Sequence, residues 1–191
     1  EQPSASAIRA LLPNGPWMDY VPAEAAAVFA DAPRYDTIWG ERAVLARLRS
    51  ITDEQWELTA HGSEGLWRKA MKASRKHSCL EEIIADTKSK RYPRTRIQRL
   101  LLCAYLGITE AALNAPLPYV RILAASKTGT GLLRKVKDAA ILPLINPGET
   151  PTQQDYYHME TLASDLYGLF IEIGHNAPCG RERSGRIIFE K

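Results

Sequence analysis

The chain has 191 residues, of which 45% are hydrophobic and 25% are charged, a composition typical of a globular protein. No apolar run approaches the roughly 20 residues that cross a bilayer, and the N-terminus shows no signal peptide. The chain starts at Glu1 instead of a methionine, so we expect it to be part of a longer gene product. Its net charge is only +3, so any strong contact with a polyanion has to be local.

The three cysteines, Cys79, Cys103 and Cys179, cannot all pair, and no two of them form a Cys-x-x-Cys. Isolated thiols in odd number fit the reducing cytosol, so we expect a cytoplasmic protein without a membrane partner. A zinc site that joins these thiols with His175 is conceivable, but the spacings match no zinc pattern. We therefore interpret the thiols as packing residues and expect no metal site.

The first two thirds of the chain read as a series of helices separated by turn residues. The signals are apolar residues at helical spacing, capping residues, and a proline in one first turn. The predicted helices span residues 4–12, 22–30, 36–50, 52–60, 64–76, 78–86 and 95–107. The predicted caps are Asp36 or Thr37, Ser63, and the capping boxes Thr52/Gln55, Ser78/Glu81 and Thr95/Gln98.

The predicted helix over residues 95–107 carries one apolar stripe. The stripe consists of Ile97, Leu100, Leu101, Ala104 and Ile108. Arg96 and Arg99 fall on its flank, where we expect them to stay in solvent while the stripe is buried. Gly107 marks the expected end of the helix.

After Pro116 the pattern changes to strand and helix. Residues 119–123 and 141–145 read as strands that enclose a helix over residues 128–140, which predicts a small parallel βαβ unit. A long helix over residues 150–173 should follow, opened by a Thr150/Gln153 capping box. We expect it to be the most buried long element, through Met159, Leu162, Leu166, Leu169 and Phe170. Residues 186–189 could add an edge strand, so the fold class is mainly α with a small α/β element.

The charge is concentrated in one stretch. Residues 64–99 hold eleven basic and four acidic residues, which is 11 − 4 = +7, so the remainder of the chain carries −4. Within it, residues 88–99 contain six cations, one aromatic residue and no acid. Arginine forks bind phosphate and stack on bases, so we predict a polyanion site. The candidate residues are Lys88, Lys90, Arg91, Tyr92, Arg94, Thr95, Arg96 and Arg99.

A plain solvated basic face, with arginine stems covering apolar surface, is the alternative for that stretch. The helix over residues 64–76 adds Arg68, Lys72, Arg75 and Lys76 on one side, where a soluble helix face explains them equally well. Thr95 is expected to open its helix, whose N–H groups favour an anion.

A second candidate lies at the N-terminus, where Ser4 and Ser6 precede Arg9 by about one helical turn. Hydroxyls and an arginine at a helix start can hold a phosphate, although an ordinary N-cap with a surface arginine also explains them. Asp165 is better interpreted as a structural carboxylate than as a functional one. The four histidines form no catalytic or metal motif, so we assign no catalytic residue to this chain.

The basic stretch resembles a known family. Residues 88–92 (KSKRY) followed by residues 95–99 (TRIQR) are similar to a signature of the tRNA(Met) cytidine acetate ligases. Further blocks resemble that family in the same order, namely residues 64–66 (EGL), 120–123 (VRIL) and 163–167 (ASDLY). Residues 4–9 (SASAIR) resemble the closing phosphate-binding motif of HxGH-type nucleotidyltransferases.

The resemblance implies an enzyme that activates acetate with ATP, with Mg²⁺ presumed, and acetylates N4 of the wobble cytidine of tRNA(Met). Because the chain holds no HxGH motif, it would be the C-terminal portion, a helical module after a Rossmann-like domain that is missing here. Residues 1–15 would end that domain and touch ATP through Ser4, Ser6 and Arg9, and residues 16–115 would bind tRNA. Residues 116–191 would form the α/β element, and the chain alone would be inactive. The alternative is a non-catalytic module that binds RNA or protein.

Overall fold

The computed structural model describes residues 4–12, 15–186 and 188–189, without the side chains of Lys127 and Phe189. Contacts divide the chain into two units, Glu1–Tyr35 and Asp36–Lys191, so the observed boundary follows Tyr35. The first unit holds α1 (Ala5–Leu11), the 3₁₀ helix η1 (Trp17–Tyr20) and α2 (Ala23–Asp31). Its only buried hydrophobic residue among those described is Trp17. The Trp17 ring packs edge to face against Phe29, with 6.5 Å between the ring centres.

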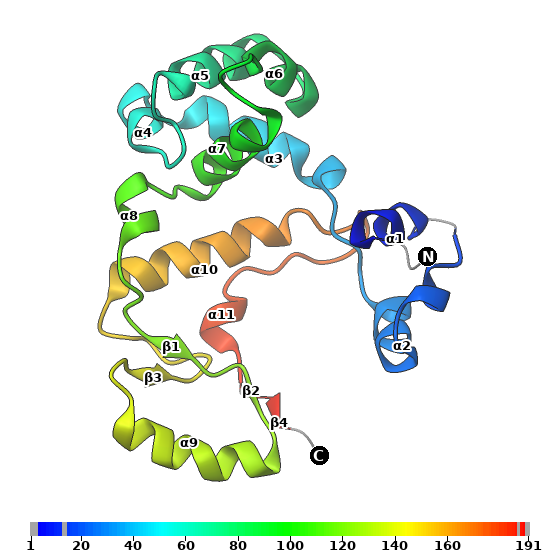
Figure 1. Cartoon of the computed structure of the whole chain (residues 1–191), viewed down its shortest axis with the longest axis vertical. Coiled ribbons are helices and arrows are strands. Elements are labelled where there is room, and N and C mark those ends of the chain that lie inside the picture. Colours follow the sequence, from blue (N-terminus) through cyan, green and yellow to red (C-terminus); the bar gives the residue numbers. More distant parts are fainter. Residues whose placement is uncertain (1–3, 13–14, 187, 190–191) are drawn as a thin grey trace. The chain divides into compact units, whose positions relative to one another are not determined.

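The second unit begins with a helical group. Its members are α3 (Thr37–Ser50), α4 (Asp53–Leu58), α5 (Leu66–Lys76), α6 (Leu80–Thr87), α7 (Arg94–Leu106) and α8 (Glu110–Asn114). Helix α7 packs against α3, α5 and α6 (Figure 1). The predicted stripe is confirmed for four of its five residues, since Ile97, Leu100, Leu101 and Ala104 are all buried. Gly107 ends α7 with a φ of 75°, which glycine adopts without strain.

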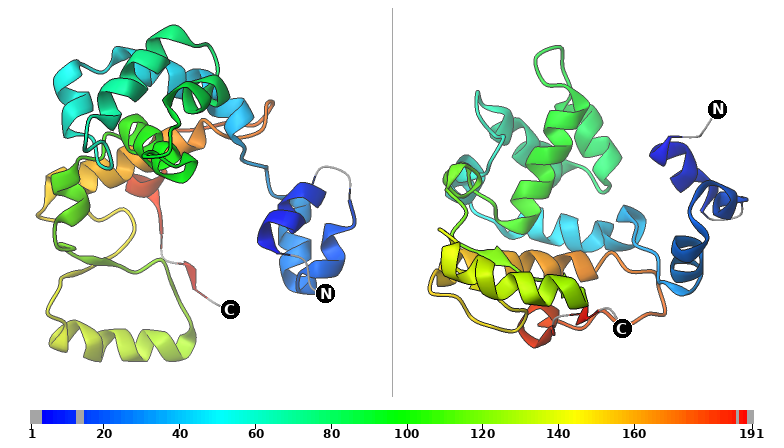
Figure 2. Two further views of the ribbon diagram at one scale, coloured as in Figure 1. Left: turned by 45° about the horizontal axis from the view of Figure 1, so that its top comes forward. Right: turned by 60° about the horizontal axis from the view of Figure 1, so that its bottom comes forward.

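An α/β region completes the second unit. It contains β1 (Val120–Arg121), β2 (Ala124–Ala125), α9 (Lys127–Ala139), β3 (Leu144–Ile145), α10 (Gln154–Gly168), α11 (Arg181–Ser184) and β4 (Ile188–Phe189). Strand β1 pairs in parallel with β3, and β2 pairs in parallel with β4. Helix α10 lies between the helical group and the strands, with α9 at the outer edge (Figures 1 and 2). The expected parallel strand–helix–strand arrangement and the mainly helical fold class are confirmed.

Several predicted caps are wrong, and at the start of α6 a tertiary contact takes the place of the predicted cap. Of the predicted capping boxes only Thr52/Gln55 is present, while Asp36 caps α3 as expected. Helix α5 begins after Gly65 instead of Ser63, and α7 begins at Arg94 after Pro93. The N-caps of α6 and α10 are Cys79 and Gln153, so Ser78 and Thr150 do not cap them. At the start of α6, the Leu80 N–H donates to Glu41 Oε1 of α3 at 2.8 Å.

The predicted burial of the long helix is wrong in part. Helix α10 ends at Gly168, and Leu169 and Ile173 beyond it are 44% and 85% exposed. Phe170 is buried as expected, and its ring packs against both α3 and α7: a Cβ on Gly40 would lie only 2.8 Å from it, and the Tyr105 ring centre is 5.7 Å away. The most buried long helix is α7, because it lies inside the helical group whereas α10 contacts that group on one side only.

Candidate nucleic-acid interface

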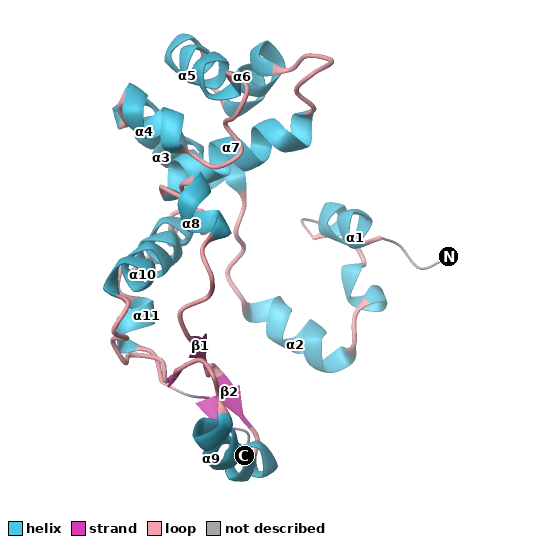
Figure 3. Cartoon of the chain, turned by 60° about the vertical axis from the view of Figure 1, so that its left-hand side comes forward, coloured by secondary structure: helices cyan, strands magenta, loops and turns pink. Residues whose placement is uncertain are grey.

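The basic segment, residues 88–99, forms the loop between α6 and α7 and the first turns of α7 (Figure 3). A turn shapes the loop, since the Tyr92 N–H donates to the Ser89 carbonyl at 3.2 Å. The Tyr92 hydroxyl donates to the backbone carbonyl of Glu64 at 2.6 Å. These bonds hold the loop against the residues that precede α5.

Glu64 organises this contact. It has a φ of 62°, a conformation that residues other than glycine seldom adopt. Its carboxylate lies 3.4 Å from Arg91 Nη2 and 3.0 Å from Arg96 Nη1. The guanidinium of Arg91, followed by that of Arg96, holds the pKa of Glu64 below its ordinary value. One acidic side chain from outside the segment therefore pairs with two of its arginines.

The apolar stripe of α7 predicted that Arg96 would face solvent, but the structure shows that it does not. Its Nη2 also donates to the Ser63 hydroxyl at 2.8 Å, and only 27% of its side chain is exposed. The guanidinium groups of Arg91 and Arg96 stand 5.8 Å and 5.6 Å from the ring centre of Tyr92. Both the hydroxyl and the ring of Tyr92 thus make contacts within the protein.

Three further cations of residues 64–99 have acidic partners. Arg94 pairs with Glu81 at 2.5 Å, Arg75 with Asp53 at 2.8 Å, and Lys76 with Asp86 at 3.2 Å. All six of these side chains are substantially exposed, so each pair adds little stability. The pairs do fix the position of the cations and reduce their attraction for an external anion.

The remaining cations of residues 64–99 have no acidic partner among the residues that the structure describes. Arg68 lies over the Trp67 ring at 4.9 Å. The side chains of Lys69, Lys72, Lys88, Lys90 and Arg99 form no hydrogen bond or ion pair with the described residues. Lys88, Lys90 and Arg99 are exposed. The structure thus separates the basic segment into a clamped set, Arg91, Arg94 and Arg96, and a free set, Lys88, Lys90 and Arg99.

Thr95 does not cap α7, because the helix begins one residue before it. At the other candidate site, Ser4 is the N-cap of α1, and its hydroxyl accepts a hydrogen bond from the Ala7 N–H at 3.2 Å. Ser6 and Arg9 are exposed on that helix. The ordinary N-cap interpretation therefore accounts for Ser4, while Ser6 and Arg9 remain accessible.

Among the described residues, no three His, Cys, Asp or Glu side chains gather as metal ligands. The conceived zinc set is therefore not assembled: Cys103 is buried and Cys179 is exposed. Burial raises the pKa of the Cys103 thiol, as expected of a packing residue. Asp165 accepts the Gly180 N–H at 2.7 Å, which confirms its structural interpretation. No helix of the described residues has the length and apolar character needed to span a membrane.

Comparison with known proteins identifies the family. A family model described as HIGH Nucleotidyl Transferase matches residues 1–179. The chain belongs to this family. The match includes the start of α1 and the whole basic segment, so both candidate sites lie within the HIGH nucleotidyltransferase homology.

Two curated relatives that this chain resembles are named tRNA(Met) cytidine acetate ligase. The protein from Acetivibrio thermocellus is 29% identical over 157 residues, which are 76% of this chain and 38% of the relative. The one from Kosmotoga olearia is 24% identical over 216 residues, covering 97% of this chain and 50% of the relative. The chain thus spans at most half the length of these relatives.

A solved structure shows the same fold. The crystal structure of Thermotoga maritima TmcAL bound with alpha-thio ATP superimposes with a TM-score of 0.77 at 20% sequence identity. The similarity covers 98% of this chain and 52% of the other. It confirms a mainly helical fold with short parallel strands for this family member. The expectation of a missing Rossmann-like domain before residue 1 gains no support from these matches and stays a prediction.

The sequence located the basic segment but did not predict that Glu64 pairs with two of its arginines. Glu64 lies more than twenty residues before Arg91, and no periodicity connects them. The one available signal was the pair Glu64-Gly65 before a helix, which the family resemblance includes. The sequence therefore indicated where the cations are, and the structure shows which of them have partners.

Proposed function

We propose that this chain supplies the tRNA-binding surface of a cytoplasmic tRNA(Met) cytidine acetate ligase. The intact enzyme would use ATP and acetate, through an acetyl-adenylate, to form N4-acetylcytidine at the wobble position of the tRNA. Family membership and the names of the curated relatives support this assignment. The observation that carries it is the free set, three exposed cations without acidic partners in the described part of the chain, beside three clamped arginines.

The free set would bind phosphate. An ammonium or guanidinium that already faces a carboxylate must give up that pair before it can bind a phosphate, whereas Lys88, Lys90 and Arg99 form no such pair with any described residue. Binding of RNA phosphate by such groups releases counterions, so the affinity falls as salt rises. The clamped set, with Tyr92 and Thr95, would instead give the loop the shape that presents the free cations.

The N-terminal residues would contribute to a nucleotide site. Ser6 and Arg9 are exposed on α1 and would contact ATP phosphates, while Ser4 holds the start of the helix. Mg²⁺ would arrive with the ATP, held by its phosphates. We assign no catalytic residue to this chain, so adenylation requires groups that it does not contain.

The proposal is tested with two triple variants that remove the same charge. Lys88→Gln, Lys90→Gln and Arg99→Gln remove the free set, and Arg75→Gln, Lys76→Gln and Arg94→Gln remove three paired cations. Affinity for tRNA is measured across a salt series. The free-set variant should bind more weakly, and its salt slope should fall by about one unit per lost contact. The paired variant should keep most of its affinity.

Two results would contradict the proposal. An equal loss in both triple variants would mean that total charge matters and the free set does not. Unchanged affinity at every salt concentration would remove the RNA-binding role and favour the protein-interaction alternative. Melting temperatures of the same samples exclude unfolding as the cause.

A further inference from the structure

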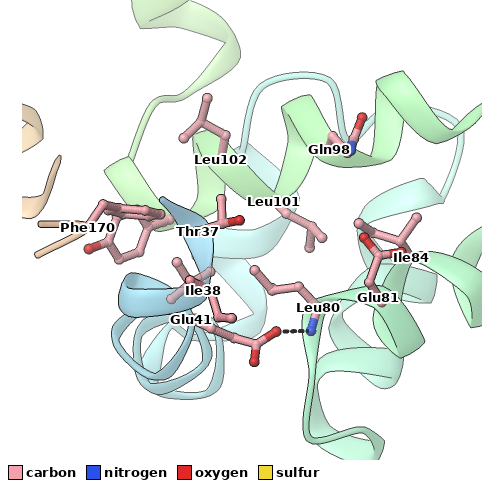
Figure 4. A pocket seen from close by; sticks show the side chains of 12 residues that line it. Thr37, Ile38, Glu41, Leu80, Glu81, Ile84, Gln98, Leu101, Leu102 and Phe170 are labelled. Atoms are coloured by element: carbon pink, nitrogen blue, oxygen red, sulfur yellow. Dashed lines mark hydrogen bonds between the residues drawn. The ribbon is translucent and has the colours of Figure 1, made fainter. Parts of the chain in front are cut away.

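A cavity of about 420 Å³ lies between α3, α6 and α7 in the helical group (Figure 4). Leu80, Ile84 and Leu101 contribute to its apolar walls, and its charged lining residues are Glu41 and Glu81. No lysine or arginine is among the described residues that line it. A phosphate would meet carboxylates there and no cation, so an anion site of the helical group has to lie outside this cavity.

The ion pairs of Glu64 with Arg91 and Arg96 have the composition of an anion site. Both guanidinium groups converge on one carboxylate, with Arg91 Nη2 at 3.4 Å and Arg96 Nη1 at 3.0 Å. Beside them, the Ser63 hydroxyl accepts a hydrogen bond from Arg96 Nη2 at 2.8 Å and donates to no described residue. Arginines and hydroxyls are groups with which proteins bind phosphate oxygens. A phosphodiester carries one negative charge on two oxygens, as a carboxylate does, so it can replace Glu64 without changing the charge.

The side chain of Glu64 can leave this site at small cost. It is 46% exposed and that of Arg91 is 64% exposed, so the pair is open to solvent. The Glu64 carboxylate has no further partner among the described residues. Exposed ion pairs contribute little stability, so an incoming anion has little to overcome.

The loop should stay in place when the Glu64 side chain leaves, because backbone atoms also hold it. The Tyr92 hydroxyl donates to the backbone carbonyl of Glu64 at 2.6 Å and not to its carboxylate. Arg96 Nη2 likewise donates to the Ser63 carbonyl at 3.3 Å. Exchange of the carboxylate for a phosphate therefore needs a side-chain movement only, and Tyr92 and Arg96 keep their backbone contacts.

We propose that Glu64 fills, in the free protein, an anion site that one phosphodiester of the bound RNA takes over. Glu64 is then an autoinhibitory competitor, which holds Arg91 and Arg96 in position and has to be displaced before RNA binds there. The inference rests on the proposed tRNA-binding function and adds one phosphate contact to those of the free set. Lys90 of the free set directly precedes Arg91 in the chain, so the added contact lies next to a free cation.

The sign of one substitution tests the exchange. Glu64→Gln keeps the length of the side chain and removes the competing charge, so the intact 191-residue chain should bind a fluorescently labelled tRNA transcript more tightly. The gain should be about two- to tenfold, the value of two exposed ion pairs. If Glu64 served only to shape the loop, the same variant would bind more weakly. Glu57→Gln is the matched control, because it removes an exposed carboxylate that pairs with no described residue.

A second set of variants asks whether the gain depends on the released arginines. Arg91→Gln should weaken tRNA binding more in the Glu64→Gln background than in the unmodified chain, and it should cancel most of the gain. Arg75→Gln removes a cation that pairs with Asp53, so it should have the same small effect in both backgrounds. Melting temperatures of all variants show whether each one is folded at the temperature of the binding measurement.

The outcomes distinguish the inference from the function on which it rests. Unchanged or weaker tRNA binding by Glu64→Gln would overturn the exchange, and so would an equal gain in Glu57→Gln, which would reflect net charge alone. A gain that survives Arg91→Gln in full would also overturn it. Each of these results leaves the proposed function standing if removal of the free set still weakens binding. Absence of tRNA binding by the unmodified chain would overturn the proposed function and the exchange together.

Discussion

The helical group and the α/β region of the second unit are held together by different forces. In the helical group, Leu48, Trp56, Leu66, Ile83 and Ile97 have no exposed surface at all. In the α/β region the buried cluster is small, formed by Tyr119, Ile145 and Tyr157. The helical group is stabilised mainly by apolar burial, whereas the α/β region depends on polar bonds between its short elements.

Arg121 of β1 is the centre of those polar bonds. Only 9% of its side chain is exposed, and it pairs with Glu160 of α10 at 2.7 Å and with Glu182 of α11. The Tyr119 hydroxyl donates to Glu160 at 2.6 Å, and the Arg121 guanidinium stands 5.5 Å from the Tyr157 ring centre. Strands of two residues bury too little surface to be stable by themselves, so this polar network holds them in position.

The largest effect is expected from a cavity in the helical group. Leu100 has no exposed surface, so Leu100→Ala should lower the free energy of unfolding by about 2–5 kcal/mol. Leu102 is 53% exposed on the same helix, and Leu102→Ala should change it by only about 0.5 kcal/mol. Urea unfolding of both variants checks this. Similar losses would mean that α7 is not the centre of the core.

A smaller and more local effect is expected from the polar network. Arg121→Ala leaves Glu160 and Glu182 without their cation, which should cost about 1–3 kcal/mol. Arg181→Ala removes an exposed cation of α11 and is the control. Hydrogen exchange should show faster opening of β1, β3 and α11 in Arg121→Ala, with the helical group protected. Uniform loss of protection would contradict the division into two differently stabilised regions.

The smallest effect is expected when acid breaks the clamp, the ion pairs that Glu64 forms with Arg91 and Arg96. These arginines hold the pKa of Glu64 below its ordinary value of 4.5. A lowered pKa in the folded state means that the clamp contributes fully above pH 4.5 and is lost as the pH falls through the lowered value. Tyr92 fluorescence or NMR shifts should report this loosening, while the core stays folded.

Glu64→Gln should release the clamp at neutral pH, and its Tyr92 signal should then no longer respond to acid. Glu57→Gln removes an exposed carboxylate of α4 that forms no ion pair with the described residues, so it is the control. A Tyr92 signal that still titrates in Glu64→Gln would show that another acid holds the loop.

Local pattern was sufficient for much of the secondary structure. Helical spacing predicted α3 and α7, and the β-branched runs around α9 predicted the parallel pairing of β1 with β3. These predictions succeeded because periodicity and propensity depend on near neighbours in the chain. The shortest helices, such as η1, α8 and α11, were missed because four or five residues show no period.

The sequence by itself determined a mainly helical chain with one basic segment, whose residues resemble a tRNA-modifying family. Only the tertiary structure decided which of these residues contact one another. Glu64 reaches Arg91 and Arg96, Glu41 meets the start of α6, and the cavity forms between three helices. Each of these contacts joins residues far apart in the chain. Their distance is set by how helices pack, which no local pattern of residues records.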